Sequence, residues 1–292
     1  MKREGSGISG FFVDKAIGFW TRAFDFSDYQ LYQWRRKRFH LQFKPSGQDI
    51  YVVSHMKSGT TWTQMILFQM LHGNSIGIDE IDHIEEVTPW YDVTVDIDLE
   101  EFPRPLVFKS HEMYREVPAE RPGKYLYVMR NGMDVAWSYY NHMRNYFGMD
   151  KTFAEYFDEF CSPSRRRNWF EHVAGWLENP LGREVLVLRY EDLHEDLDEA
   201  LERIAAFCGI SLDREDFVRV KERSSFDFMK RYWHKFGIRA GNKRAKNANF
   251  LRRGIMGDGI DKLGEEKKRN FFERFDAVLG GFSQAAPYRP GS

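Results

Sequence analysis

Residues 55–62 read HMKSGTTW and lie between a short apolar run at Ile50–Val53 and a longer apolar pattern at Trp62–Leu71. The short run is typical of a buried strand and the longer one of a buried helix, so the eight residues connect a strand to a helix. Backbone N–H groups at the start of a helix attract anions, and Lys57 adds a full positive charge. The stretch therefore predicts a site for an oxyanion.

Two other interpretations of these eight residues stay open. The lysine precedes the glycine, so the pattern G-x-x-x-x-G-K-[ST] of ordinary P-loop NTPases is absent, which disfavours that class. A capped helix without a ligand is the simpler alternative, with Ser58 or Thr60 accepting hydrogen bonds from the first N–H groups.

Three more strand-like runs follow, at Leu106–Phe108, Tyr125–Met129 and Val185–Leu188, and helical patterns lie at Met133–Met143 and Leu197–Phe207. Continuous apolar runs that alternate with helices indicate a parallel sheet covered on both faces. We therefore expect an α/β fold with a central parallel β-sheet flanked by helices. No Pro/Gly/Ser-rich linker divides the chain, which favours a single domain over residues 1–292, with residues 1–15 as a flexible lead-in.

Polar side chains follow each of the four predicted strands. They are Lys57, the pair Lys109 and His111, Arg130, and Tyr190. In open parallel sheets, ligands bind beyond the carboxyl ends of the strands. The sequence therefore predicts that these five side chains gather around one site.

The composition excludes several classes of protein. The 292 residues are 42% hydrophobic with a formal net charge of −1, which suits a globular core and argues against a nucleic-acid partner. The two cysteines, Cys161 and Cys208, are too few for a disulfide framework or a zinc cluster. Neither a signal peptide nor a membrane span is apparent, so we expect a cytoplasmic protein without stable membrane insertion.

Five motifs occur in one order between about residues 48 and 262. They are K-S-G-T-T-W at 57–62, K-x-H at 109–111, R-N-x-x-D-V-A-x-S-Y-Y at 130–140, R-Y-E-D-L at 189–193 and R-R-G-x-x-G-D at 252–258. Together they resemble the cytosolic-type sulfotransferases. The resemblance implies an enzyme that transfers a sulfuryl group from 3'-phosphoadenosine 5'-phosphosulfate (PAPS) to a hydroxyl or amine and leaves adenosine 3',5'-bisphosphate (PAP).

The resemblance also implies which residues bind PAPS. The 5'-phosphosulfate would lie against Lys57, Ser58, Gly59, Thr60 and Thr61, and the adenine against Trp62. The 3'-phosphate would be bound by Arg130 and Ser138 and covered by Arg252, Arg253 and Gly254. The adenine end would include Tyr190 and the stretch Ser224, Ser225 and Phe226.

For the transfer step, His111 is the candidate general base, because imidazole titrates near neutral pH. Lys57 and Lys109 would stabilise the charge that develops during transfer. The K-x-H spacing places Lys109 and His111 on the same face of an extended segment. This scheme needs no metal.

The expected acceptor is a small, lipophilic or aromatic hydroxyl compound, because aromatic residues cluster where acceptor pockets of the family lie. They are Phe24, Trp90, Tyr91, Tyr146 and Phe147, which could equally fill the core. Residues 235–253 are basic and contain two glycines, so a mobile lid is expected there.

Two departures from the family pattern stand out. Met56 occupies the position of a common proline, and Gly259 and Ile260 replace the usual tryptophan. The family's dimerisation segment is not recognisable, which leaves the oligomeric state open. The competing functions are an ATP-dependent phosphotransferase, which would need a magnesium carboxylate, and a nucleotide-binding protein without catalytic activity.

Overall fold

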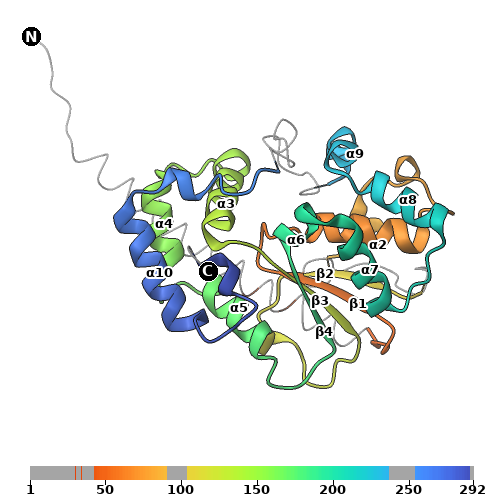
Figure 1. Cartoon of the computed structure of the whole chain (residues 1–292), viewed down its shortest axis with the longest axis horizontal. Helices are drawn as coiled ribbons and strands as arrows, with labels where there is room; N and C mark the ends of the chain where they lie inside the picture. Colours follow the sequence, from red (N-terminus) through yellow and green to blue (C-terminus); the bar gives the residue numbers. More distant parts are fainter. Residues whose placement is uncertain (1–29, 31–33, 35–42, 91–103, 237–253, 290–292) are drawn as a thin grey trace, which may run out of the picture. The chain divides into compact units, whose positions relative to one another are not determined.

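The computed structural model describes residues 30, 34, 43–90, 104–236 and 254–289 (Figure 1). The chain divides into two compact units, one of residues 1–44 and 91–99 and the other of residues 45–90 and 100–292. Most of the first unit lies outside the described residues. The fold and the site described below belong to the second unit.

The second unit contains a four-stranded sheet of order β2-β1-β3-β4, in which every neighbouring pair is parallel. Its strands are β1 (Ile50–Ser54), β2 (Val107–Ser110), β3 (Lys124–Met129) and β4 (Val185–Arg189). Each strand coincides within two residues with one of the four apolar runs. The predicted parallel sheet is confirmed.

The α-helices of the described residues follow the strands and continue toward the C-terminus. They are α2 (Thr60–His72), α3 (Gly132–Phe147), α4 (Phe153–Cys161), α5 (Trp169–Glu178), α6 (Tyr190–Glu195), α7 (Leu197–Cys208), α8 (Arg214–Arg223), α9 (Phe226–Arg231) and α10 (Glu265–Leu279). The predicted helices at 62–71, 133–143 and 197–207 correspond to α2, α3 and α7.

Short 3-10 helices lie in the connections. They are η1 (Ile78–Glu80), η2 (Ile84–Glu86), η4 (Tyr114–Glu116), η5 (Trp233–Lys235), η7 (Ile260–Lys262) and η8 (Ala286–Tyr288). No helix in the described part of the chain combines the length and the apolar character that crossing a bilayer requires.

The two faces of the sheet are covered by different helices (Figure 1). Side chains alternate along a strand, so Ile50 and Val52 of β1 share one face with an aliphatic core that α2, α7 and α8 complete. On the other face Tyr51 stacks on Tyr125 at 5.0 Å, and Trp176 of α5 lies 5.5 Å from Tyr125. A sheet buried on both faces explains why its strands are apolar throughout.

Strand β1 lies inside the sheet, and its last residues pair with both neighbours. Val53 is in register with Ser110 of β2, and Ser54 with Val128 of β3. On the far side of β3, Met129 is in register with Arg189 of β4. The carboxyl ends of all four strands therefore meet at one edge, and the residues that follow them are neighbours.

Candidate active site

A cavity of about 400 Å³ lies at this edge. All five side chains predicted to converge line it, namely Lys57, Lys109, His111, Arg130 and Tyr190. Other predicted site residues that line it are Gly59, Thr60, Thr61, Trp62, Ser138, Phe226 and Gly254. The parallel sheet thus brings residues from distant parts of the described chain to one cavity.

The turn between β1 and α2 has an unusual backbone. Lys57 has φ 70° and Gly59, the N-cap of α2, has φ 109°. No described side chain caps this helix, and the Thr60 hydroxyl instead lies 2.5 Å from that of Ser54. The hydroxyl of Ser58 is buried and has no hydrogen-bond partner among the described residues. The capped-helix alternative therefore does not describe this turn.

Glycine at position 59 is required for two reasons. Its φ lies in the left-handed region, which L residues rarely adopt. A Cβ there would also lie 2.8 Å from Cδ2 of Tyr190. The Tyr190 ring therefore packs directly on the backbone of the turn.

Arg130 follows β3 and is 9% exposed. Its guanidinium donates to the carbonyl of Lys57 at 3.3 Å and to that of Ile255 at 3.4 Å, and it lies 4.2 Å from the centre of the Tyr190 ring. Its Nε is buried without a hydrogen-bond partner among the described residues. The arginine is thus fixed in place by the backbone while part of its donor capacity remains available to a ligand.

Asp134 links this arginine to the C-terminal part of the chain. Its carboxylate accepts hydrogen bonds from the backbone N–H groups of Gly257 and Gly259, each at 2.8 Å, and lies 3.8 Å from the Arg130 guanidinium. A Cβ at position 259 would lie 2.3 Å from the carbonyl oxygen of Met133. The close packing of this segment on α3 explains why glycine occupies position 259.

Three rings from two helices pack together at another part of the wall. Trp62 lies 5.7 Å from Tyr190 and 4.7 Å from His194, measured between ring centres. The indole N–H of Trp62 donates to the carbonyl of Ser224 at 2.7 Å, which fixes the ring. Aromatic faces held in this way can stack on a planar base.

Phe226, next to this group, is in contact with the C-terminal segment. Gly254 has φ 64°, and a Cβ there would lie 2.8 Å from the Phe226 ring. Ser225, in contrast, does not line the cavity, and its hydroxyl caps α9 by accepting from the N–H of Phe228 at 3.3 Å.

His111 has a defined tautomer. Its Nδ1 lies 2.7 Å from the carbonyl oxygen of Ser54, and because a carbonyl can only accept, Nδ1 must donate. The neutral ring therefore has its lone pair on Nε2. Burial, followed by the nearby Lys109 charge, holds the pKa of His111 well below 6.5. The imidazole is accordingly unprotonated at neutral pH and able to accept a proton.

Lys109 is 8% exposed, so it is not the solvated strand end that an isolated lysine would suggest. Its ammonium group lies 3.4 Å from the Glu85 carboxylate and 4.1 Å from the centre of the Trp90 ring. The Trp90 ring also makes an edge contact with His111 at 5.2 Å. Glu85 was not singled out from the sequence, because its pairing joins residues far apart in the chain.

The predicted acceptor residues have different positions. Trp90 and Phe147 line the cavity. Tyr146 does not line it and is buried against His142, with ring centres 4.6 Å apart. Phe24 and Tyr91 lie outside the described residues, as do Arg252, Arg253 and most of the predicted lid.

Helix α3 contributes cavity residues that the sequence reasoning missed. They are Trp137, Tyr139, His142 and Met143. His142 lies four positions after Ser138, so helical spacing could have identified it. Burial, with the charges of Lys57 and Lys109, lowers the pKa of His142 to about 3. His194 also lines the cavity, so three histidines, each with a lowered pKa, lie in its wall.

The chain matches a family model described as "Sulfotransferase domain" over residues 47–283. It is 29% identical to mouse "Sulfotransferase 1B1" over 260 residues, which covers 81% of this chain and 83% of the relative. It is also 29% identical to human "Sulfotransferase 2A1" over 246 residues, covering 77% and 86%.

Solved structures have the same fold. The mouse sulfotransferase SULT7A1, complexed with PAP, superimposes with a TM-score of 0.65 at 22% identity and covers 86% of this chain and 92% of that one. Retinol dehydratase in complex with androsterone and inactive cofactor PAP has a TM-score of 0.66 at 21% identity and covers 83% of both chains. The family model spans most of the sequence and includes all five motifs. The chain therefore belongs to the sulfotransferase family.

Proposed function

We propose that this sulfotransferase transfers the sulfuryl group of PAPS to a hydroxyl or amine of a small, apolar acceptor, with His111 as the general base. One observation carries the proposal. The Nδ1–H of His111 donates to the carbonyl of Ser54, which makes Nε2 the acceptor nitrogen in a cavity that Lys57 and Lys109 also line.

The donor side of the cavity, which we define as residues 57–62 with Arg130, Tyr190, Phe226 and Gly254, fits the chemistry of PAPS. The start of α2 offers backbone N–H groups beside Lys57, and Ser58 and Arg130 each have a buried polar atom without a partner among the described residues. Phosphate groups accept hydrogen bonds from such donors, and an adenine would stack on Trp62 or Tyr190.

When bound, PAPS supplies the sulfuryl group and its activated linkage to phosphate. The chain's own residues then act on the proton and the charges. His111 Nε2 takes the proton from the acceptor hydroxyl as that oxygen attacks. Lys57 and Lys109 provide fixed positive charges beside the atoms that become more negative during transfer. Because Glu85 and Trp90 hold Lys109, its side chain needs little reorganisation as charge develops during transfer.

The acceptor side, which we define as Trp90, Tyr139, His142, Met143 and Phe147, is mainly aromatic and apolar. Burial of an apolar ring or hydrocarbon skeleton against such a wall is favourable in free energy. We therefore propose a lipophilic phenol or alcohol as the preferred acceptor. A cytoplasmic location is also proposed, and it is supported by Cys161 and Cys208, which are free thiols.

A thermal-shift series with a transfer assay tests this function. PAP should raise the melting temperature, since a ligand that binds only the folded state stabilises it. Stabilisation by ATP with magnesium but not by PAP would instead favour a phosphotransferase. The purified protein, supplied with PAPS and a panel of phenols, alcohols and amines, should sulfate the lipophilic members. PAP binding without transfer to any member would indicate a non-catalytic nucleotide-binding protein.

A further inference from the structure

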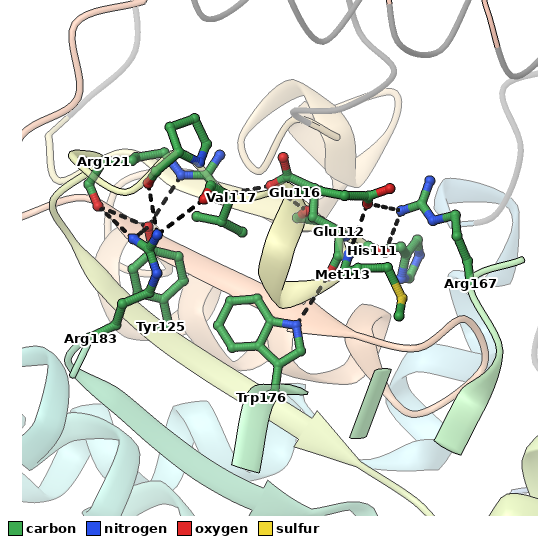
Figure 2. A network of polar contacts seen from close by, with 12 residues as sticks. His111, Glu112, Met113, Glu116, Val117, Arg121, Tyr125, Arg167, Trp176 and Arg183 are labelled. Carbon is green, nitrogen blue, oxygen red and sulfur yellow. Dashed lines mark hydrogen bonds and ion pairs between the residues drawn. The ribbon is translucent and has the colours of Figure 1, made fainter. Parts of the chain in front are cut away.

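The segment that follows β2 carries His111 and continues into η4. It is held by polar contacts from outside the cavity, many of them from a loop and a helix that come more than fifty residues later (Figure 2). None of the five motifs includes these later residues. We propose that Arg167 is a positioning residue that fixes the orientation of His111, the proposed base.

Arg167 contacts both ends of the segment. Its guanidinium donates to the carbonyl oxygen of His111 at 2.6 Å and lies 3.1 Å from the carboxylate of Glu116 (Figure 2). The same Glu116 oxygen accepts from the backbone N–H of Met113 at 2.9 Å. One guanidinium and one carboxylate thus close the turn from residue 111 to residue 116.

The residue after the base is held as well. The indole of Trp176 donates to the carbonyl of Glu112 at 3.0 Å, and the buried Glu112 carboxylate pairs with Arg121 at 2.7 Å. Together with the bond from the ring of His111 to Ser54, these contacts anchor the base through its ring, its own carbonyl and its neighbour. Anchors of this kind set the direction of Nε2, on which proton transfer depends.

The backbone at Arg167 has an uncommon conformation. The residue has φ 53°, a left-handed conformation that is uncommon outside glycine. Asn168 maintains the turn, because its side chain caps α5 at the N–H of Glu171 at 3.0 Å and donates to the carbonyl of Arg165 at 3.2 Å. The contacts of the guanidinium compensate for this conformational cost.

The position of Arg167 also has an electrostatic consequence. The titratable and charged groups that face His111 are Lys109 from β2, His55 from the turn after β1, His172 from α5, and Arg167. Burial is the main cause that lowers the pKa of His111, and the positive charges of Lys109 and Arg167 lower it further. Arg167 therefore favours the unprotonated base, whereas the Glu116 carboxylate partly offsets that charge.

Three substitutions distinguish a positioning role of Arg167 from a general effect on the stability of the fold. Arg167→Gln removes the charge, Arg167→Lys keeps the charge and weakens the fork-shaped contact, and Glu116→Gln leaves the Arg167 charge without its counter-charge. Arg115→Gln is the matched control, because Arg115 is an exposed η4 residue paired with Glu171 at 3.5 Å.

The Kd for PAP and two further readouts are measured on each full-length variant. The further readouts are kcat/KM for sulfuryl transfer and the pKa of His111 from NMR of the 15N-histidine-labelled protein, with the signal assigned by its loss in His111→Gln. Arg167→Gln should lower kcat/KM about 10- to 100-fold, leave the Kd for PAP unchanged and raise the pKa of His111. Glu116→Gln should shift that pKa downward. Arg167→Lys should keep the pKa near the native value with an intermediate kcat/KM, and Arg115→Gln should match the native protein.

A shift of the pKa in the same direction in Arg167→Gln and Glu116→Gln would mean a structural role only and would overturn the proposal. So would a kcat/KM within twofold of native in Arg167→Gln. If Arg167→Gln does not fold, the other two variants decide. A native kcat/KM in Arg167→Lys, together with an unchanged pKa of His111 in Glu116→Gln, would also overturn the proposal. The proposal rests on His111 acting as the base. That role fails separately, through full activity of His111→Ala, while the NMR titration still measures what Arg167 does.

Discussion

The donor side and the acceptor side of the cavity are built by different means. On the donor side, turns that follow strands present charged and polar groups, and hydrogen bonds to the backbone fix them, as for Arg130 and Trp62. On the acceptor side, one helix contributes most of the wall, and rings pack against rings, as His142 does against Phe147 at 5.9 Å. We infer that changes on the donor side impair binding of one ligand, whereas changes on the acceptor side alter which acceptor is preferred.

The largest effect is expected where the two sides meet. His111→Ala should lower kcat about 100- to 10,000-fold, because it removes the proposed general base. The Kd for PAP, measured by calorimetry, should stay nearly the same. His234→Ala, a change of an exposed histidine in η5, is the control. Turnover near the native value in His111→Ala would remove the residue from the role of base.

The next largest effect tests the donor side. Arg130→Ala should weaken PAP binding about 10- to 100-fold, since hydrogen bonds to charged groups contribute about 1.5–3 kcal/mol. Adenosine 5'-phosphosulfate lacks the 3'-phosphate, so its binding should change much less if Arg130 contacts that phosphate. Calorimetric titrations with both nucleotides measure the difference.

Arg144→Ala, an exposed arginine on α3, is the control for Arg130. Equal losses for the two nucleotides would show that Arg130 acts on some other part of the donor.

A smaller effect is expected from the backbone of the same side. Gly59→Ala should lower the free energy of unfolding by about 1–3 kcal/mol, because φ at this position is positive and the new Cβ would collide with Tyr190. It should also weaken PAP binding. Gly182→Ala separates the two causes, since Gly182 has φ 60° with no atom within 4 Å of the added Cβ. Similar losses of stability in both variants would assign the cost to backbone strain alone.

The smallest effect is expected on the acceptor side. His142→Leu should leave the Kd for PAP unchanged and alter kcat/KM for individual acceptors by about tenfold in either direction, because it changes the polarity of the wall but not the base. The measurement is a panel of phenols and alcohols of different size. Asn145→Ala, an exposed change on the same helix, is the control. A uniform loss across the panel would contradict a role in selectivity.

Much of the donor side could be predicted from the sequence, for a physical reason. In a parallel sheet the carboxyl ends of the strands must meet, so four apolar runs were enough to bring Lys57, His111 and Arg130 together. The partners of these residues were not predictable. Glu85 pairs with Lys109 of β2, and Arg167 contacts the carbonyl of His111. Both come from distant parts of the chain, and their contacts depend on loop paths that no periodic pattern describes.

The cavity residues on helices α3 and α6 were predicted only in part. His142 and His194 each lie four positions after a predicted site residue, Ser138 and Tyr190 respectively, and residues with that spacing share one face of a helix. Applying the spacing rule would have identified both. Tyr146 shows the limit of the reasoning, because an aromatic residue in the right segment turned inward and packed on His142.

The contacts of Asp134 with Gly257 and Gly259 have a consequence for the order of synthesis. Gly254, Ile255 and Asp258 form part of the cavity wall. The turn at residues 57–62 leaves the ribosome much earlier than these residues. A nascent chain that ends before residue 254 lacks that part of the wall. We infer that full affinity for the nucleotide arises only after this C-terminal segment has been synthesised.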